Sequence, residues 1–349
     1  MSSSIAYKCK PRQARDYIIR CLEAGLVPYL VGSPGGGKSA IVRKIGKDFK
    51  LLVIDHRAST MDPTDATGLP FFENGRAKFM PFTELFPTED MEIPKGYNGW
   101  LLFLDELPSA PRAVQAALYK IILDRMVGQY KLHPNVFIVA AGNLATDRAI
   151  VNPIGTAMQS RLIHLELEVD KDQWLADVAL PEEYDSRIIA FLNQFESKLM
   201  DFRPDHMDRT FPCPRTWEFA NKLIKGREIS ENDIPLLAGT ISSGVAVEFV
   251  QFCQVYKDLV PISEIVKDPE NCKVPQDLSL KWATISNMME KVDDENFEAF
   301  CTYANRFDLS FRILFYRSVL VRNADLRTHP YFGKAAADLS RYLNDSKAA

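Results

Sequence analysis

The chain has few cysteines, no long hydrophobic run and no excess of positive charge, and each shortage excludes a class of protein. The longest apolar runs, over 27–31, 100–104 and 136–141, are far shorter than the roughly 20 residues that span a bilayer. The six cysteines are scattered, without a C-x-x-C pair or histidines at zinc-site spacing, which indicates reduced thiols. With 42 basic and 46 acidic residues, no global positive field attracts nucleic acid.

What remains is the composition of an ordinary globular protein. The 349 residues are 46% hydrophobic and 25% charged, enough for two or three domains with buried cores. The first residues contain no apolar stretch of the kind that forms an export signal. We therefore expect a cytoplasmic protein without a membrane segment.

Five short apolar runs in the first half predict strands. They are apolar almost throughout, as is typical of parallel strands covered on both faces, and lie at 27–31, 51–55, 100–104, 136–141 and 162–167. Helical patterns alternate with them over 12–23, 39–49 and 113–123. This alternation predicts an α/β fold with a five-stranded parallel sheet flanked by helices.

Helical patterns dominate from about residue 170, where strand signals almost vanish. We expect an α/β core over 1–170, a helical lid over 171–258 and a helical C-terminal extension over 259–349. Three prolines within 260–277 indicate a connector. Five arginines between positions 306 and 327 spread around a helix, which favours a solvated surface over a nucleic-acid face.

The strongest motif is a glycine-rich loop. Residues 32–39 read Gly-Ser-Pro-Gly-Gly-Gly-Lys-Ser and fit the phosphate-binding pattern G-x-x-x-x-G-K-[ST], between an apolar strand and a helical pattern. Inward backbone N–H groups and the helix N-terminus would hold phosphate, Lys38 would reach the β- and γ-phosphates, and Ser39 would ligate Mg²⁺. The predicted binding set is Gly32, Ser33, Pro34, Gly35, Gly36, Gly37, Lys38, Ser39 and Ala40.

Polar residues follow two later strands. Asp105 and Glu106 end the apolar run at 100–104, and Asn143 follows the run at 136–141. We expect Asp105 to hold the metal through water, Glu106 to polarise the attacking water, and Asn143 to lie near the γ-phosphate. The alternative for the two carboxylates is a strand end reaching solvent, and for Asn143 a turn.

The ordered set of motifs resembles an AAA+ ATPase, and more narrowly the MoxR-like branch. The phosphate loop and the Asp-Glu pair are common to many NTPases. Two segments distinguish the MoxR-like branch from other NTPases. Residues 62–70 read Asp-Pro-Thr-Asp-Ala-Thr-Gly-Leu-Pro, and residues 214–217 read Pro-Arg-Thr-Trp. Residues 142–149 and 160–162 add to the likeness, which covers roughly 10–225.

The resemblance implies further roles. Asn143 resembles sensor 1, Arg161 the arginine finger that enters a neighbouring subunit's site, and Arg215 sensor 2 in the lid. Arg148 resembles a second trans-acting arginine, with a local ion pair to Asp147 as the equal alternative. The family also implies ATP and Mg²⁺, a homo-oligomeric ring (a hexamer), a protein client, and a partner with a von Willebrand A-type domain.

Two hairpin inserts are predicted within the core. An Asn-Gly turn at 74–75 lies between aromatic arms over 71–82, and a second hairpin is expected near 126–134. Exposed aromatics on the first would be costly unless they touch a partner or client, the alternative being packing on their own domain.

The leading functional hypothesis is a chaperone-like ATPase that remodels or activates a protein client. The alternative is a GTP- or ATP-driven motor subunit of restriction type, associated with nucleic acid, because residues 143–148 share its Asn-x-x-x-Asp-Arg spacing. A third hypothesis is a slowly hydrolysing scaffold, against which Glu106 counts. The acidic pI near 5.8 argues against nucleic acid.

Overall fold

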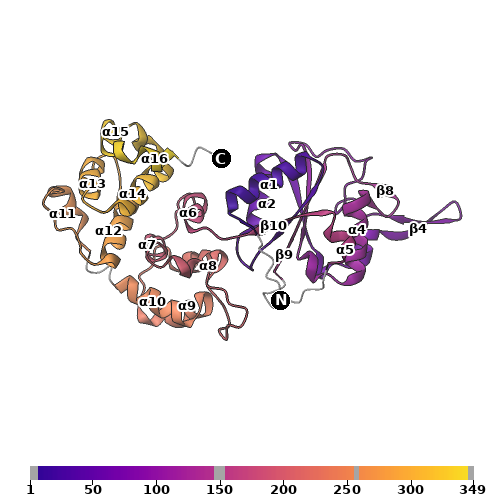
Figure 1. Ribbon diagram of the computed structural model, residues 1–349, viewed down its shortest axis with the longest axis horizontal. Coiled ribbons are helices and arrows are strands. Elements are labelled where there is room, and N and C mark those ends of the chain that lie inside the picture. The colour runs from indigo at the N-terminus through magenta and orange to yellow at the C-terminus, as the bar shows by residue number, and fades with distance from the viewer. Residues whose placement is uncertain (1–6, 145–153, 255–258, 345–349) are drawn as a thin grey trace. The chain divides into compact units, whose positions relative to one another are not determined.

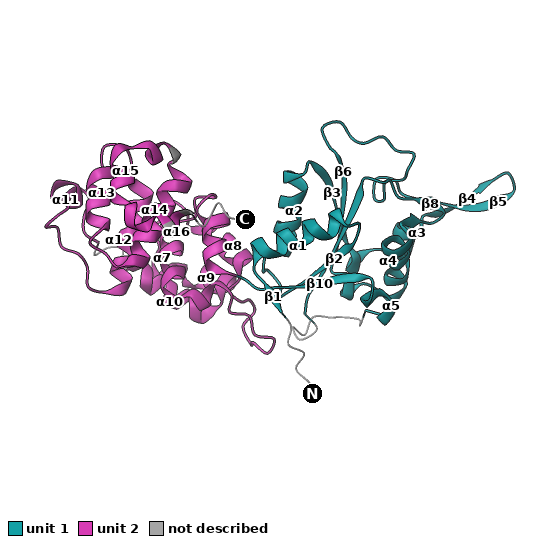
Figure 2. Cartoon of the chain, turned by 45° about the horizontal axis from the view of Figure 1, so that its top comes forward, with its two compact units in different colours: residues 1–169 teal, residues 170–349 magenta. Residues whose placement is uncertain are grey.

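The computed structural model describes residues 7–144, 154–254 and 259–344 of the chain. These form two compact units, unit 1 over Met1–Val169 and unit 2 over Asp170–Ala349 (Figures 1 and 2). The unit boundary falls where the strand pattern of the sequence ends. The finer division of unit 2 into a lid and an extension stays a prediction. In the described part of the chain, no helix is long and apolar enough to cross a bilayer.

Unit 1 is built on a six-stranded parallel sheet with the order β1-β10-β2-β9-β6-β3. Its strands are β1 (Lys8–Cys9), β2 (Val27–Val31), β3 (Leu51–Arg57), β6 (Gly99–Asp105), β9 (Val136–Gly142) and β10 (Leu162–Leu167). The α/β class and the five predicted strands are confirmed. The sixth, β1, is a correction to the five-stranded prediction, and its two residues are too few for a hydrophobic pattern to reveal.

Helices cover both faces of this sheet (Figure 2). They are α1 (Pro11–Glu23), α2 (Lys38–Asp48), α3 (Pro63–Thr67), α4 (Arg112–Asp124) and α5 (Thr156–Gln159). Alternate strand residues point to opposite faces, so the sheet feeds two separate cores. Leu101 and Phe103 pack with α1 and α2, whereas Leu102 and Leu104 pack with α4.

Both predicted hairpins are present. The first pairs β4 (Leu69–Glu73) with β5 (Arg76–Met80) and projects from unit 1 in Figures 1 and 2. Asn74 and Gly75 have φ of +52° and +73°, the left-handed pair that a tight two-residue hairpin turn requires. The second hairpin pairs β7 (Met126–Val127) with β8 (Tyr130–Lys131).

Unit 2 is helical throughout its described residues. It contains α6 (Lys171–Trp174), a π-helix (Leu175–Ala179), α7 (Ser186–Gln194), α8 (Pro214–Ile224), α9 (Ile234–Ile241), α10 (Ser243–Gln254), α11 (Ile262–Lys267), α12 (Leu278–Lys291), α13 (Phe297–Ala304), α14 (Leu309–Arg322), α15 (Pro330–Ala335) and α16 (Ser340–Asn344). The predicted connector over 260–277 contains α11. The six residues of this helix, which lie between two prolines, are too few to give a periodic hydrophobic pattern that predicts a helix.

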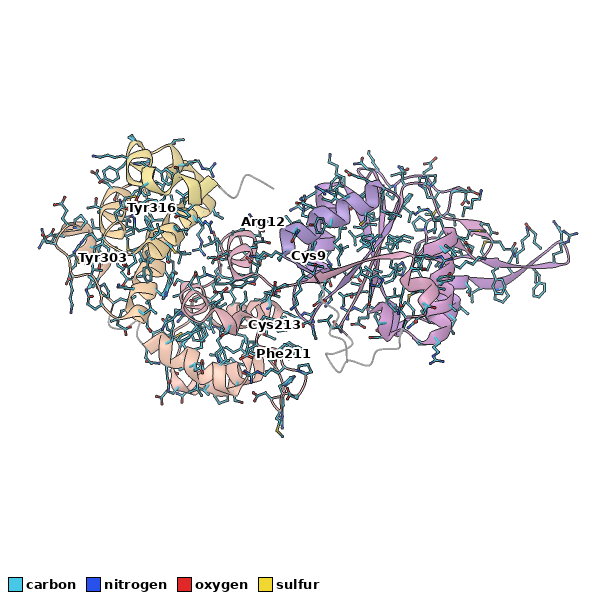
Figure 3. The ribbon with its side chains drawn as sticks, in the orientation of Figure 1. Cys9, Arg12, Phe211, Cys213, Tyr303 and Tyr316 are labelled. Atoms are coloured by element: carbon cyan, nitrogen blue, oxygen red, sulfur yellow. The ribbon has the colours of Figure 1, made fainter. Side chains whose placement is uncertain are left out.

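Buried tyrosines anchor the last helices of unit 2 (Figure 3). The hydroxyl of Tyr303 donates to the carbonyl of Lys273 at 2.7 Å, and that of Tyr316 donates to Asn305 Oδ1 at 3.0 Å. The sequence predicted a solvated surface for the five arginines between positions 306 and 327, but not all of their side chains are solvated. Arg322, for example, is partly buried and donates to the carbonyl of Tyr184 at 3.2 Å.

Candidate functional site

The glycine-rich loop joins β2 to α2 at the carboxyl edge of the sheet. Gly35 and Gly37 adopt φ of +75° and +95°, conformations that glycine allows at low cost. Gly37 is the N-cap of the 11-residue α2, so no side-chain oxygen caps the helix start, and a Cβ there would meet nothing within 4 Å. The first backbone N–H groups of α2 have no carbonyl partner within the helix, and an uncapped helix N-terminus after a glycine-rich loop is the arrangement that binds phosphate.

Lys38 links the loop to the neighbouring strand. Its side chain is buried, and its ammonium donates to the carbonyls of Gly32 at 2.6 Å and Ser33 at 3.0 Å. It also donates to Asn143 Oδ1, directly after β9, at 3.1 Å. The contact brings together two residues that lie 105 positions apart in the sequence. A phosphate oxygen at the loop would thus meet a lysine held on one side by the predicted sensor.

Ser39 and Asp105 form the metal-type pair of the site. The Ser39 hydroxyl donates to Asp105 Oδ2 at 3.2 Å, at the end of β6. Hydroxyl and carboxylate oxygens suit Mg²⁺, which is commonly held by one or two protein groups together with substrate phosphates. Among the described residues, no three His, Cys, Asp or Glu gather as a metal cage. The donor set fits a magnesium ion that arrives with a nucleotide.

Glu106 is held in a strained conformation beside this pair. Its φ of +56° is a left-handed value rare for a residue with a side chain, and its N–H donates to Asp105 Oδ1 at 2.8 Å. The hydroxyl of Ser59 donates a very short hydrogen bond to Glu106 Oε2. Ser59 was not among the predicted site residues. Its position just after β3, the strand beside β6, is the signal that could have found it.

Arg161 lies at the amino edge of the sheet, opposite the carboxyl edge that carries the glycine-rich loop. It precedes β10, whose Leu162 pairs with Val27 at the start of β2, five residues before Gly32. At about 3.3 Å per residue, the strand length places roughly 16 Å between that level and the loop. The structure therefore separates Arg161 from the cluster around Lys38, Asp105 and Asn143.

Arg161 is exposed but its guanidinium is held. One nitrogen donates to the carbonyl of Ala157 in α5 at 2.6 Å. The guanidinium carbon also lies 5.5 Å from the ring centre of Tyr119 in α4. Tyr119 is a second residue that the sequence analysis missed, because its helical spacing marks only a residue that packs on the sheet.

Two predicted arginines lie outside this cluster. Arg215 is exposed in the first turn of α8 and belongs to unit 2. Arg148 and its alternative partner Asp147 lie outside the described residues. Both assigned roles stay predictions.

The two discriminating motifs build local structure. Asp62 accepts from the N–H of Thr64 at 2.9 Å, and Asp65 accepts from the N–H of Asp62 at 2.9 Å, which caps α3 before the first hairpin. In the second motif, Trp217 is fully buried and its indole N–H donates to the carbonyl of Lys198 at 2.7 Å. Their residues thus set the positions of the hairpin and of α8.

No family model and no curated protein matches the chain. Among solved structures, it is similar to the RuvB Holliday junction branch migration motor of Thermotoga maritima, with 14% identity over 80% of this chain and 84% of that one and a TM-score of 0.37. A mutant of the same RuvB gives 16% identity over 95% and 82%, with a TM-score of 0.35. NtrX from Brucella abortus gives 16% identity over 99% and 69%, with a TM-score of 0.34. Likenesses this distant do not bear on what the chain binds or does.

Proposed function

We propose that this chain is an AAA+ ATPase of the MoxR-like branch, which hydrolyses ATP between the subunits of a ring in order to remodel or activate a protein client. The observation that carries the proposal is the convergence of the loop, Ser39, Asp105 and Asn143 at one edge of the sheet, through the contacts of Lys38 and Ser39. Sequence-distant residues meet there in the arrangement that phosphoryl transfer needs.

Each residue of the cluster has a distinct task in this proposal. A bound Mg²⁺ supplies positive charge that polarises the phosphate oxygens. Ser39 and Asp105 hold that ion, and Lys38 donates to the β- and γ-phosphate oxygens. Glu106 accepts a proton from the attacking water, and the amide of Asn143 orients that water.

A ring assembly completes the site. Arg161 directly precedes β10 at the amino edge of the sheet, so it is poorly placed to serve its own subunit's loop, and a neighbouring subunit's nucleotide is the alternative. A cation there would stabilise the charge that develops on the γ-phosphoryl oxygens. Arg215 stands in the first turn of α8, where the helix dipole disfavours a cation, which supports a role beyond helix stability.

The first hairpin supports a protein client. Phe72 is 76% exposed, and Phe71 and Phe79 are each 46% exposed, an apolar surface that is costly in water. We assign this hairpin to contact with the client polypeptide. A partner with a von Willebrand A-type domain rests on the motif resemblance alone.

Nucleotide turnover by the full chain and by Lys38→Ala tests the core of the proposal. Wild type should hydrolyse ATP in a Mg²⁺-dependent reaction, and Lys38→Ala should lose nucleotide affinity. Lys44→Ala removes an exposed lysine from the same helix and should behave as wild type. ATP binding that survives unchanged in Lys38→Ala would contradict the site. A clear preference for GTP would favour the motor-subunit alternative.

Sedimentation with and without nucleotide tests the ring. If ATP binds between subunits, it should shift the protein from small species to one discrete large species, because a head-to-tail contact that closes makes a ring. A protein that stays monomeric at micromolar concentration with saturating ATP would overturn the assembly.

A further inference from the structure

We propose that Tyr119 is a positioning residue that presets Arg161 for the neighbouring subunit's nucleotide. The inference rests on the proposed function, since it assigns Arg161 a partner site in trans. It adds that Arg161 is held in position before the neighbouring nucleotide binds. The ring of Tyr119 and the carbonyl of Ala157 form the contact site that holds it, here called the seat.

The seat holds the guanidinium from two directions. The carbonyl of Ala157 accepts one N–H at 2.6 Å, while the aromatic ring of Tyr119 lies 5.5 Å from the guanidinium carbon. A cation near an aromatic face is attracted by the ring's quadrupole, and arginine is the usual cation in such pairs. The remaining guanidinium N–H groups keep their capacity to donate to phosphate oxygens.

The seat itself is anchored in the core of unit 1. Tyr119 packs against the hydrophobic cluster that contains its fully buried neighbour Leu118. Met158, next to Ala157, is buried in the same cluster. Two helices, α4 and α5, thus present their halves of the seat from one packed core, and they lie side by side in Figures 1 and 2.

Such a seat matters because an exposed arginine side chain has several rotatable bonds. Fixing them at the moment of reaction costs conformational entropy, which a preset geometry removes in advance. Helix α4 also begins six residues after Glu106, so the segment that carries the water-polarising carboxylate continues directly into the helix under Arg161. The helix therefore joins a subunit's own site to the arginine that it offers to the next.

Mixed rings test the seat separately from the subunit's own site. Arg161→Ala subunits supply intact loops without an arginine, and Lys38→Ala subunits supply arginines without a usable loop. We expect Lys38→Ala to restore hydrolysis to Arg161→Ala, and Lys38→Ala with Tyr119→Phe to restore it equally, since the aromatic face is kept. With Tyr119→Leu in the donor, the restored rate should fall about two- to fivefold, as expected for the loss of an exposed cation–π contact. Tyr97→Leu, at an exposed tyrosine of the same unit, is the matched control donor.

The outcomes distinguish the trans role of Arg161 from the positioning role of Tyr119. No rescue by Lys38→Ala itself, despite co-assembly, would overturn the trans role of Arg161 and this inference with it. Rescue by Lys38→Ala together with full rescue by the Tyr119→Leu donor would overturn the seat alone.

A double-mutant cycle guards against a folding defect in Tyr119→Leu. If Tyr119 acts only through Arg161, Tyr119→Leu should slow hydrolysis in the wild-type background and have no further effect in Arg161→Ala. An equal loss in both backgrounds would mean that Tyr119 is merely structural, and would contradict the proposal.

Discussion

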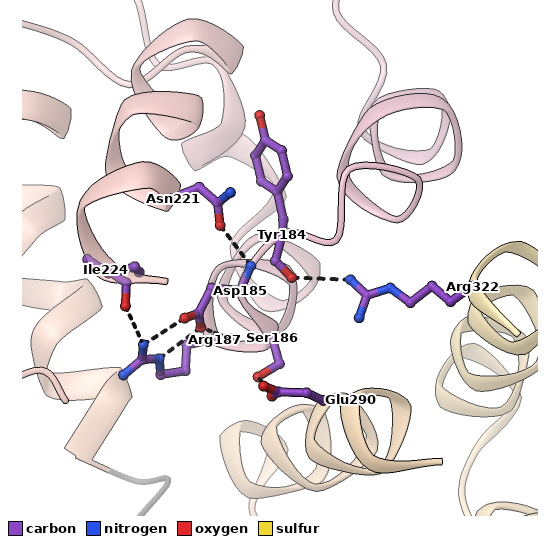
Figure 4. A network of polar contacts seen from close by, with 8 residues as sticks. All are labelled: Tyr184, Asp185, Ser186, Arg187, Asn221, Ile224, Glu290 and Arg322. Atoms are coloured by element: carbon purple, nitrogen blue, oxygen red, sulfur yellow. Dashed lines mark hydrogen bonds and ion pairs between the residues drawn. The ribbon is translucent and has the colours of Figure 1, made fainter. Parts of the chain in front are cut away.

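The polar clusters of the two units use similar residues in different ways. In unit 1, Lys38 and Ser39 begin α2, whereas Asp105, Glu106 and Asn143 stand at the ends of β6 and β9, beside the glycine-rich loop. In unit 2, the cluster drawn in Figure 4 lies between helices, and its members bind one another or backbone carbonyls.

The unit 2 cluster holds helices together, and we call it the brace. Arg187 and Asp185 form a two-point ion pair of 2.7 and 2.8 Å, and Arg187 also donates to the carbonyl of Ile224 in α8 at 3.1 Å. Ser186 donates to Glu290 in α12 at 2.8 Å. These contacts tie α7 to α8 and α12. The comparison teaches that position at a strand end beside a glycine-rich loop and a helix N-terminus, and not the residue types alone, marks the candidate site.

The largest effect should come from Glu106→Gln. An amide cannot accept the proton of the attacking water, so hydrolysis should fall on the order of 10³-fold while ATP stays bound. Single-turnover kinetics with a binding measurement would check this. Glu89→Gln, at an exposed carboxylate of the same unit, should leave both values at the wild-type level. Hydrolysis at the wild-type rate in Glu106→Gln would remove Glu106 from the mechanism.

Arg187→Met tests the unit 2 half of the comparison, in which the polar cluster stabilises the fold and does not bind nucleotide. Loss of one partner leaves the carboxylate of Asp185, which is 9% exposed, without its ion pair, and breaking such a buried pair costs about 3 kcal/mol or more. Denaturant unfolding should show that loss, with nucleotide affinity unchanged under native conditions. Arg227→Met, at an exposed arginine three residues after Ile224, is the control. A lost affinity with unchanged stability would mean that the brace is a binding site.

A smaller effect is expected from Ser59→Ala. The Ser59 hydroxyl occupies an oxygen of Glu106, so its removal should leave that oxygen free to accept a hydrogen bond from the attacking water. We expect basal hydrolysis to rise about two- to fivefold, the change that corresponds to the roughly 0.5–1 kcal/mol net contribution of a typical side-chain hydrogen bond. Thr60→Ala, whose hydroxyl donates to the carbonyl of Arg57, should not change the rate. A decrease in Ser59→Ala would mean that the contact aids catalysis.

The smallest effect concerns pH. His56 in β3 is buried, stacks on Phe86 and donates to the carbonyl of Leu85 at 2.9 Å, and burial lowers its pKa below the ordinary 6.5. The unfolded chain therefore takes up a proton near pH 6.5 that the folded chain excludes, so stability falls as pH drops below that value. The free energy of unfolding of His56→Gln should depend less on pH between 7 and 5. His164→Gln, at an exposed histidine, should keep the wild-type slope. An unchanged slope in His56→Gln would refute this assignment.

The sequence allowed the sheet and both hairpins to be predicted because their signals are local. Apolar runs, an Asn-Gly turn and a glycine loop each depend on neighbouring residues. The contacts of Ser59 and Tyr119 are long-range, since they depend on which strands and helices become neighbours. Helix α11 was missed because six residues carry little periodic signal, and β1 because two residues carry none.

Amide hydrogen exchange of the full chain, with and without ATP and Mg²⁺, tests the central claim most directly. If the carboxyl edge is the nucleotide site, ligand should slow exchange over 32–40 and after the ends of β6 and β9, because binding stabilises the state that it contacts. Exchange in α7 and α12, which hold the brace, should not change, and Lys38→Ala should show none of the protection. Protection absent from 32–40, or equal in Lys38→Ala, would contradict the account.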